Sequence, residues 1–188
     1  MDKINTCYGF IDANIMKRLS KIKLLAFDVD GTITEGGVYL DNTGLEFKKF
    51  YTKDGYGLHH LNKSGVYCAA ITGRKAELTS RRMQEIGIEL LIQGEWDKKT
   101  ALTKLCNKLS IDLENTVTIG DDLNDLSMFK IAGVTACPAD AHPYILKISD
   151  LIMTKKGGFG AVRELCDLIM MAQGKLNLDG GPIEWLLH

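Results

Sequence analysis

Short apolar runs alternate with longer segments of helical period along most of this chain. The apolar runs predict strands at residues 24–27, 67–71, 89–92 and 117–119, with two shorter strands at 134–136 and 151–153. Apolar residues at helical spacing predict helices over 11–19 and over about 55–63, 75–86, 98–109 and 123–131. A last long helix is expected from near Gly160 to near Gly174.

This alternation predicts an α/β fold with a doubly wound, mostly parallel sheet that helices cover on both faces. A chain of 188 residues suits one domain, so residues 1–188 are expected to form a single unit. Ligands of such sheets bind beyond the carboxyl ends of the strands. The residues that follow each strand are therefore the candidates for chemistry.

A β-hairpin is predicted over about residues 36–51, because the polar turn at 41–44 separates two apolar stretches. Only about 35 positions lie between Thr32 and Tyr67, and independent domains rarely fall below roughly 50 residues, so no separate cap domain fits there. The hairpin exposes Val38, Leu40, Leu45 and Phe47. An exposed apolar surface of this kind favours oligomerisation through the hairpin. The alternative is that the hairpin folds back and covers these side chains against its own domain.

Composition and charge exclude several classes of protein. The chain has 23 basic and 24 acidic residues and a formal net charge of -1, whereas nucleic-acid binders carry a basic excess. The apolar run at 168–172 is too short to span a bilayer, so no membrane association is expected. The first residues lack a secretion pattern, and the five cysteines lie far apart. These features favour reduced thiols in a cytoplasmic protein.

Polar groups follow each of the four longer predicted strands, and those of the third strand come a few residues after its end. In chain order they are Asp28-Val29-Asp30-Gly31-Thr32, Thr72-Gly73-Arg74, Asp97-Lys98 and Gly120-Asp121-Asp122-Leu123-Asn124-Asp125. Because parallel strands end at one edge of the sheet, we expect these groups to share one rim. A calcium loop is a poor alternative for the first group, since a buried strand and not a helix precedes it.

These segments resemble the four motifs of the haloacid dehalogenase superfamily of phosphotransferases. Four further segments resemble the 3-deoxy-D-manno-octulosonate 8-phosphate phosphatase family: residues 6–9, 54–57, 160–164 and 172–176. The resemblance implies a capless, Mg²⁺-dependent phosphomonoesterase that acts through an aspartyl-phosphate intermediate. It also implies a sugar-acid phosphate substrate and a place in making the lipopolysaccharide precursor.

The resemblance implies catalytic roles that suit the chemistry of phosphate esters. Asp28 is the expected nucleophile, and Asp30 the acid and base that serves the leaving alcohol and then water. Asp28, the backbone carbonyl of Asp30, and Asp121 are the expected Mg²⁺ ligands. A carboxylate about 4 Å from a phosphate is repelled by about 1 kcal/mol per charge pair in water, and more at lower dielectric, so a cation is needed beside it.

Other residues are expected to support the phosphoryl group and the metal. Thr72, the Gly73 backbone N–H and Lys98 are expected to hold the phosphoryl group. Asp125 is expected to support the metal site from behind, and Asp122 to cap a helix. Lys99 competes with Lys98, and the family pattern favours Lys98.

A further set of residues is expected to bind the rest of the substrate. The segment after the hairpin should line the site: Tyr51, Thr52, Lys53, Asp54 and Gly55. Arg74 and Arg82 match family positions that bind substrate, and an arginine fork suits a carboxylate. His59 stands where some relatives carry a basic residue, and an exposed helix residue is an equal alternative.

The resemblance also implies a homotetramer whose four hairpins form a central barrel. The tail, about residues 175–188, is then expected to reach a neighbouring active site. The Gly157–Gly160 loop is either a flexible turn or a lid over a neighbour's site.

Three other functions remain as alternatives. A sialate-type 9-phosphate phosphatase would share the fold and the motifs. A phospho-receiver signalling domain also uses Asp, Mg²⁺, Thr and Lys, but it needs an Asp directly after the third strand, where this chain has Gln93-Gly94-Glu95-Trp96. A catalytically silent assembly domain would not need all four motifs.

Overall fold

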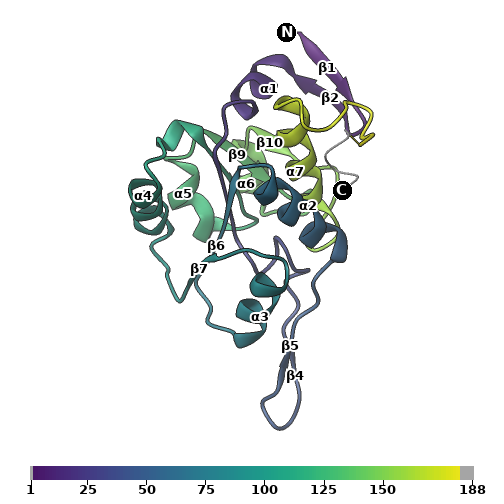
Figure 1. Ribbon diagram of the computed structural model, residues 1–188. Coiled ribbons are helices and arrows are strands. Elements are labelled where there is room, and N and C mark those ends of the chain that lie inside the picture. The colour runs from purple at the N-terminus through teal and green to yellow at the C-terminus, as the bar shows by residue number, and fades with distance from the viewer. Residues whose placement is uncertain (1, 183–188) are drawn as a thin grey trace.

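The computed structural model describes residues 2–182, and a six-stranded parallel sheet forms its centre (Figure 1). The strands run in the order β10-β9-β8-β3-β6-β7, and each neighbouring pair is parallel. Their bounds are β3 Leu24–Phe27, β6 Tyr67–Thr72, β7 Leu90–Gln93, β8 Thr116–Ile119, β9 Val134–Cys137 and β10 Leu151–Ile152. The predicted doubly wound α/β architecture is therefore confirmed.

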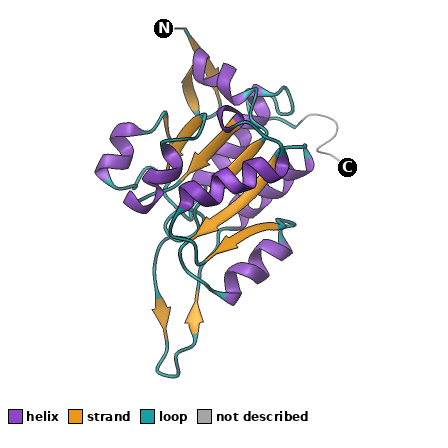
Figure 2. Cartoon of the chain, turned by 90° about the vertical axis from the view of Figure 1, so that its left-hand side faces the viewer, coloured by secondary structure: helices purple, strands orange, loops and turns teal. Residues whose placement is uncertain are grey.

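Helices cover both faces of this sheet (Figure 2). They are α1 Ala13–Leu19, α2 Thr52–Lys63, α3 Glu77–Glu85, α4 Lys98–Leu109, α5 Leu126–Phe129, α6 Pro143–Ile148 and α7 Ala161–Ala172, with 3-10 turns η1 Leu113–Asn115 and η2 Leu123–Asp125. Alternate residues of β3 face opposite layers: Leu25 and Phe27 pack with α1, α2, α3 and α7, whereas Leu24 and Ala26 pack with α4, α5 and α6. All four are fully buried, which explains why the strand is a continuous apolar run.

The predicted hairpin is present and protrudes from the body of the molecule (Figure 1). Its strands β4 Tyr39–Leu40 and β5 Glu46–Phe47 pair antiparallel, and an isolated bridge joins Thr34 to Phe50 at its base. The apolar side chains predicted to be exposed are between 53% and 65% exposed: Val38, Leu40, Leu45 and Phe47. The hairpin therefore does not fold back on its own domain.

The N-terminal segment differs from the sequence prediction. Residues before the first helix form an antiparallel pair, β1 Lys3–Thr6 with β2 Gly9–Asp12, where no strand was predicted. The helix begins at Ala13 and not at Ile11, because the Asp12 side chain accepts a hydrogen bond from Asn14 N and caps it. The Cys7 N–H donates to the Leu178 carbonyl at 2.8 Å, so the described part of the tail returns to the β1–β2 turn.

Two further elements correct the prediction. The helix expected over 123–131 is divided into η2 and α5, and the short helix α6 was not predicted. The predicted tail extends beyond the described residues, and Ile183, Trp185, Leu186 and Leu187 lie outside them. Within residues 2–182, no helix is long and apolar enough to cross a bilayer.

Candidate active site

The candidate site begins where β3 ends. Asp28 follows Phe27 directly, and its N–H still donates to the Ile119 carbonyl at 3.0 Å, so the sheet holds its backbone in place. Gly31 has a positive φ of 93° and lies against Asp121, where a Cβ would overlap the carboxylate. The two strand-end groups can approach each other only because residue 31 is glycine.

Lys98 links two of these carboxylates. Its side chain is fully buried, and its Nζ donates to Asp28 Oδ1 at 2.5 Å and to Asp125 Oδ1 at 2.6 Å. It is the first residue of α4, whose start Asp97 caps by accepting from Thr100 N at 3.1 Å. Lys99 is exposed, so Lys98 is the lysine that reaches the rim.

Asp125 also organises the loop after β8. Its Oδ2 accepts hydrogen bonds from the backbone N–H groups of Asp121 at 2.9 Å and Asp122 at 3.3 Å. Asp121 Oδ1 accepts from the Thr32 hydroxyl at 3.0 Å. The Asp122 side chain accepts from Leu123 N at 2.7 Å and caps η2, as predicted. Asp125 therefore stands behind Asp121 and orients it.

The carboxylates of Asp28, Asp121 and Asp125 form one cluster, with ligand oxygens within 4.8 Å of one another. Burial raises the pKa of Asp28 to about 8, with a further rise from Asp125 and an opposing effect of Lys98. Burial and Asp125 raise the pKa of Asp121 to about 7, and burial raises the pKa of Asp125. Crowded buried carboxylates of this kind fit a divalent cation that prefers hard oxygen ligands, such as Mg²⁺.

Asp30 has a different partner from Asp28. Its Oδ1 accepts from Lys48 Nζ at 2.5 Å, and only 3% of the Lys48 side chain is exposed. Its Oδ2 is buried and has no hydrogen-bond partner among residues 2–182. Lys48 was not among the residues predicted from the sequence. The alternation of side chains along the hairpin could have indicated it. Leu45 and Phe47 are exposed, so Lys48 faces the opposite side of the strand.

Thr72 ends β6 beside β3, and its buried hydroxyl accepts from Arg74 N at 3.3 Å. A Cβ on Gly73 would lie 2.9 Å from the Trp96 indole, so this ring covers the backbone of Gly73. The Arg74 guanidinium donates to Glu46 of the hairpin at 2.8 Å. The group after β6 therefore lies at the same rim, and the hairpin contacts it.

The segment expected to line the site is divided between surface and interior. Tyr51 lies just before α2, partly exposed, and Thr52 and Lys53 are exposed. Asp54 is fully buried and accepts from Gly160 N at 3.2 Å and Arg163 N at 2.7 Å, so it caps the start of α7.

Three other candidate residues lie in the packing of α2 against α3. A Cβ on Gly55 would meet the Arg82 guanidinium and Ile86. Arg82 also donates to Glu85 at 2.8 Å, and His59 Nδ1 lies 3.1 Å from the Ile86 carbonyl oxygen. The structure does not bring Gly55, His59 or Arg82 into contact with the carboxylate cluster.

The glycine loop before α7 packs on the loop after β3. The Gly158 N–H donates to the Thr32 carbonyl at 2.9 Å, and a Cβ on Gly157 would overlap the Gly31 carbonyl oxygen. This loop therefore borders the rim of its own chain.

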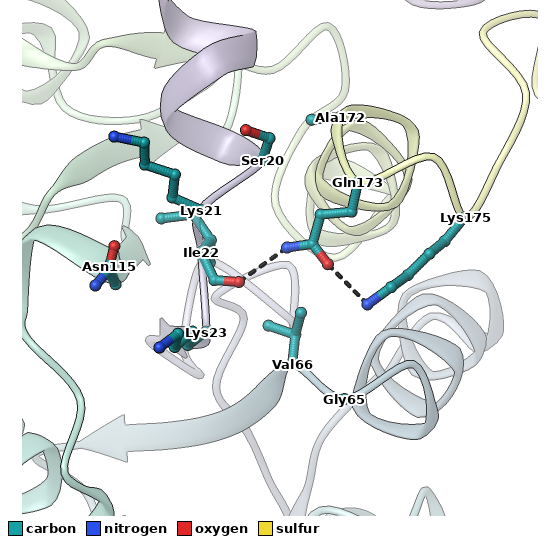
Figure 3. A pocket seen from close by; sticks show the side chains of 10 residues that line it. All are labelled: Ser20, Lys21, Ile22, Lys23, Gly65, Val66, Asn115, Ala172, Gln173 and Lys175. Carbon is teal, nitrogen blue, oxygen red and sulfur yellow. Dashed lines mark hydrogen bonds between the residues drawn. The ribbon is translucent and has the colours of Figure 1, made fainter.

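A hollow of about 740 Å³ lies at the opposite end of the strands (Figure 3). Gln173 donates there to the Ile22 carbonyl at 2.8 Å, and Lys175 Nζ donates to Gln173 Oε1 at 2.8 Å and to the Ser64 carbonyl at 2.6 Å. Helices α1, α2 and α7 all end near this hollow. A cation stabilises helix carboxyl ends, so Lys175 has a structural role there.

The comparisons with known proteins agree with this geometry. The sequence model of a family described as haloacid dehalogenase-like hydrolase matches residues 77–164. A 3-deoxy-D-manno-octulosonate 8-phosphate phosphatase of Escherichia coli is 43% identical over 172 residues, 92% of each chain. The crystal structure of the Yersinia pestis protein of that name has a TM-score of 0.92 at 42% identity, and covers 97% of this chain and 99% of that one.

A third relative was solved with ligands. The Moraxella catarrhalis protein of the same name, in complex with magnesium ion, phosphate ion and KDO, has a TM-score of 0.84 at 44% identity, and covers 86% of this chain and 93% of that one. The fold and the strand-end groups define a haloacid dehalogenase-like hydrolase without a cap domain. Within this class, the chain belongs to the 3-deoxy-D-manno-octulosonate 8-phosphate phosphatase family, whose members are phosphoric monoester hydrolases.

Proposed function

We propose that this chain hydrolyses 3-deoxy-D-manno-octulosonate 8-phosphate to the free sugar acid and phosphate, a step in making the lipopolysaccharide precursor. The names of its relatives support the substrate. The observation that carries the chemistry is Lys98, buried between Asp28 and Asp125 within the carboxylate cluster.

The first step transfers the phosphoryl group to the protein. A carboxylate oxygen of Asp28 attacks phosphorus, and the bond from phosphorus to the sugar oxygen breaks. Asp30 gives its proton to that oxygen, so the sugar leaves as a neutral alcohol. The products of this step are the free sugar acid, an aspartyl phosphate at Asp28 and the Asp30 carboxylate.

The second step releases phosphate. Asp30 takes a proton from a water molecule, whose oxygen attacks phosphorus and displaces the Asp28 carboxylate. Asp28 returns as a carboxylate and Asp30 returns as an acid, so the protein is unchanged after one turnover.

The site must also neutralise charge. Lys98 and the Thr72–Gly73 segment hold the phosphoryl oxygens and stabilise the charge that gathers on them. Mg²⁺, held by Asp28, Asp121 and the Asp30 backbone carbonyl, would supply a Lewis acid beside the same oxygens. Asp125 keeps Lys98 and Asp121 in place through its three hydrogen bonds.

A phosphate-release screen tests the proposed function. The purified protein is given the 8-phosphate of the octulosonate, 9-phosphates of nonulosonates and simple hexose phosphates, each with Mg²⁺ and with a chelator. We expect the highest kcat/KM on the octulosonate ester, and no turnover with the chelator. The Asp28→Asn variant is the matched control and should be inactive on every ester. A preference for a 9-phosphate would replace the proposed substrate with the sialate-type alternative.

We further propose that the protein acts as a homotetramer in which hairpins of different copies meet. The exposed apolar side chains of the hairpin support this assembly. The tail after residue 175 is proposed to reach a neighbouring site in that assembly.

A further inference from the structure

Residues 45–48 of the hairpin, which include strand β5, present two different faces. Leu45 and Phe47 are 54% and 53% exposed and carry the apolar face. The alternate residues point to the catalytic rim: Glu46 accepts from Arg74 at 2.8 Å, and Lys48 donates to Asp30 at 2.5 Å. This short segment therefore has a solvent side and a catalytic side.

Lys48 is committed to Asp30. Its side chain is 3% exposed, and burying an ammonium group is costly unless a charged partner offsets the lost hydration. Within residues 2–182, Asp30 is the partner with which Lys48 forms a hydrogen bond or ion pair. Lys98 pairs instead with Asp28 and Asp125. The two aspartates of the Asp28-Val29-Asp30 segment thus have separate lysines.

The contact distinguishes the two oxygens of the Asp30 carboxyl group. Lys48 is a donor only, so the oxygen that it binds, Oδ1, must accept whether Asp30 is protonated or not. Oδ2 is buried and has no hydrogen-bond partner in the described part of the chain, so Lys48 is the side chain that fixes how the Asp30 carboxyl group is turned.

We infer that Lys48 is a positioning residue for the proposed reaction: by binding Oδ1, it holds the Asp30 carboxyl group in one orientation at the rim in both steps. This inference rests on the proposed function, because it gives Lys48 a task only if Asp30 is the acid and base. It adds a residue from the hairpin to a site that otherwise comes from the ends of the central strands.

The test uses two esters with different leaving groups. A sugar alcohol needs a proton in order to leave, whereas a nitrophenolate leaves without one. In Lys48→Met, which keeps an apolar side chain of similar length, kcat for the sugar phosphate should fall by about 100-fold, the lower range for general acid–base catalysis. KM should change by less than about threefold, because the role is to orient Asp30 and not to bind the ground state.

With p-nitrophenyl phosphate the same variant should show a rapid initial burst of nitrophenolate release. The first step no longer needs the acid, so one nitrophenolate per active site appears rapidly, and slow release of phosphate follows because water still needs Asp30 as a base. Lys48→Arg, which keeps the charge and the donor, should recover part of the lost kcat. Lys49→Met is the matched control from the same segment, since Lys49 is 55% exposed and its charged partner is Glu35 and not Asp30. It should leave kcat and KM within about twofold of wild type, as for an exposed side chain with no catalytic partner.

Two results would overturn the inference. A rise in KM at unchanged kcat would make Lys48 a substrate-binding cation. Equal losses on both esters with no burst would make its role structural. Failure of the proposed function is distinguishable, because wild type would then not hydrolyse the octulosonate ester, or Asp28→Asn would remain active. The burst experiment does not depend on which sugar acid is the substrate.

Discussion

Lys98 occupies a position that intrinsic helix preferences disfavour. A cation in the first turn of a helix opposes the helix dipole by about 0.3–1 kcal/mol. In this structure Asp28 and Asp125 compensate for that cost, since both lie within 2.6 Å of its Nζ. The unfavourable placement is therefore explained by the site and not by the helix.

Replacing Lys98 should destabilise the metal-free protein. Lys98→Met leaves two buried carboxylates without their cation, and breaking a buried ion pair from one side costs about 3 kcal/mol or more. Urea unfolding in chelator should show this loss, and added Mg²⁺ should restore part of it. The adjacent exposed lysine gives the control: Lys99→Met should change the free energy of unfolding by less than about 0.5 kcal/mol. Equal effects of the two substitutions would contradict the buried pairing.

The stability of the metal-free protein should fall as the pH rises. The pKa of Asp28 is raised from 3.8 to about 8 and that of Asp121 from 3.8 to about 7, in both cases mainly by burial. At pH values between 3.8 and these raised pKa values, the folded state binds more protons than the unfolded chain. The free energy of unfolding therefore decreases as the pH rises through this range. Urea midpoints measured from pH 5 to pH 8 should decline in chelator and decline less in saturating Mg²⁺, which favours the ionised carboxylates. Identical profiles with and without Mg²⁺ would refute this account.

At the scale of elements, Asp54 connects α2 to the start of α7. Its carboxylate accepts from Gly160 N and Arg163 N, two groups at a helix start that have no partner within the helix. Asp54→Ala should therefore cost about 1–2 kcal/mol of stability, as measured by urea unfolding. Lys53→Ala, at the exposed neighbouring position, should cost little. A large rise in KM for Asp54→Ala without loss of stability would instead favour the substrate-binding role expected from the sequence.

The elements that the sequence predicted well are those with a strong local period. Strand β3 is fully buried on both faces, and α4 begins and ends where the apolar spacing indicated. Helix α6 was missed because it has six residues and buries only Ile145, too little for a period to emerge. Strands β1 and β2 were missed because their stability comes from pairing with each other, which single-strand patterns do not reveal.

The same distinction applies to the site. The order of strand-end motifs pointed to Asp28, Lys98 and Asp121, because the carboxyl ends of parallel strands meet at one edge. Lys48 was not predicted, because its contact with Asp30 depends on how the base of the hairpin, bridged from Thr34 to Phe50, lies against the loop after β3. Spacing along the chain carries no information about that placement.

At the scale of the whole molecule, strand order explains the location of the site. From β3 the chain continues to β6 on one side and later to β8 on the other, so the connections diverge at the carboxyl end of β3. A crevice forms where adjacent connections leave on opposite faces of the sheet. Asp28 and Asp30 lie at this point, in the centre of the sheet and not at its edge.

Assembly should depend on the hairpin. Replacing two of its exposed apolar residues, Leu40→Glu with Phe47→Glu, places like charges where copies are proposed to meet, so the complex should dissociate to monomers. Size-exclusion chromatography with light scattering measures this, and the circular dichroism spectrum should hardly change because both side chains are exposed on the single chain. Phe10→Glu is the control, since Phe10 is 69% exposed on β2, far from the hairpin (Figure 1). A monomeric wild-type protein would remove the tetramer proposal.

The charges at the rim also determine how the ester is admitted. When the ester arrives, the proposed mechanism has Asp30 protonated. The carboxylates of Asp28, Asp121 and Asp125 then face the ammonium groups of Lys48 and Lys98, which leaves a formal charge of one minus. A divalent ion bound there would change this to one plus, so an arriving phosphate dianion would meet a weakly cationic site. One excess charge gives only modest long-range attraction, so the association rate should fall only moderately as ionic strength rises.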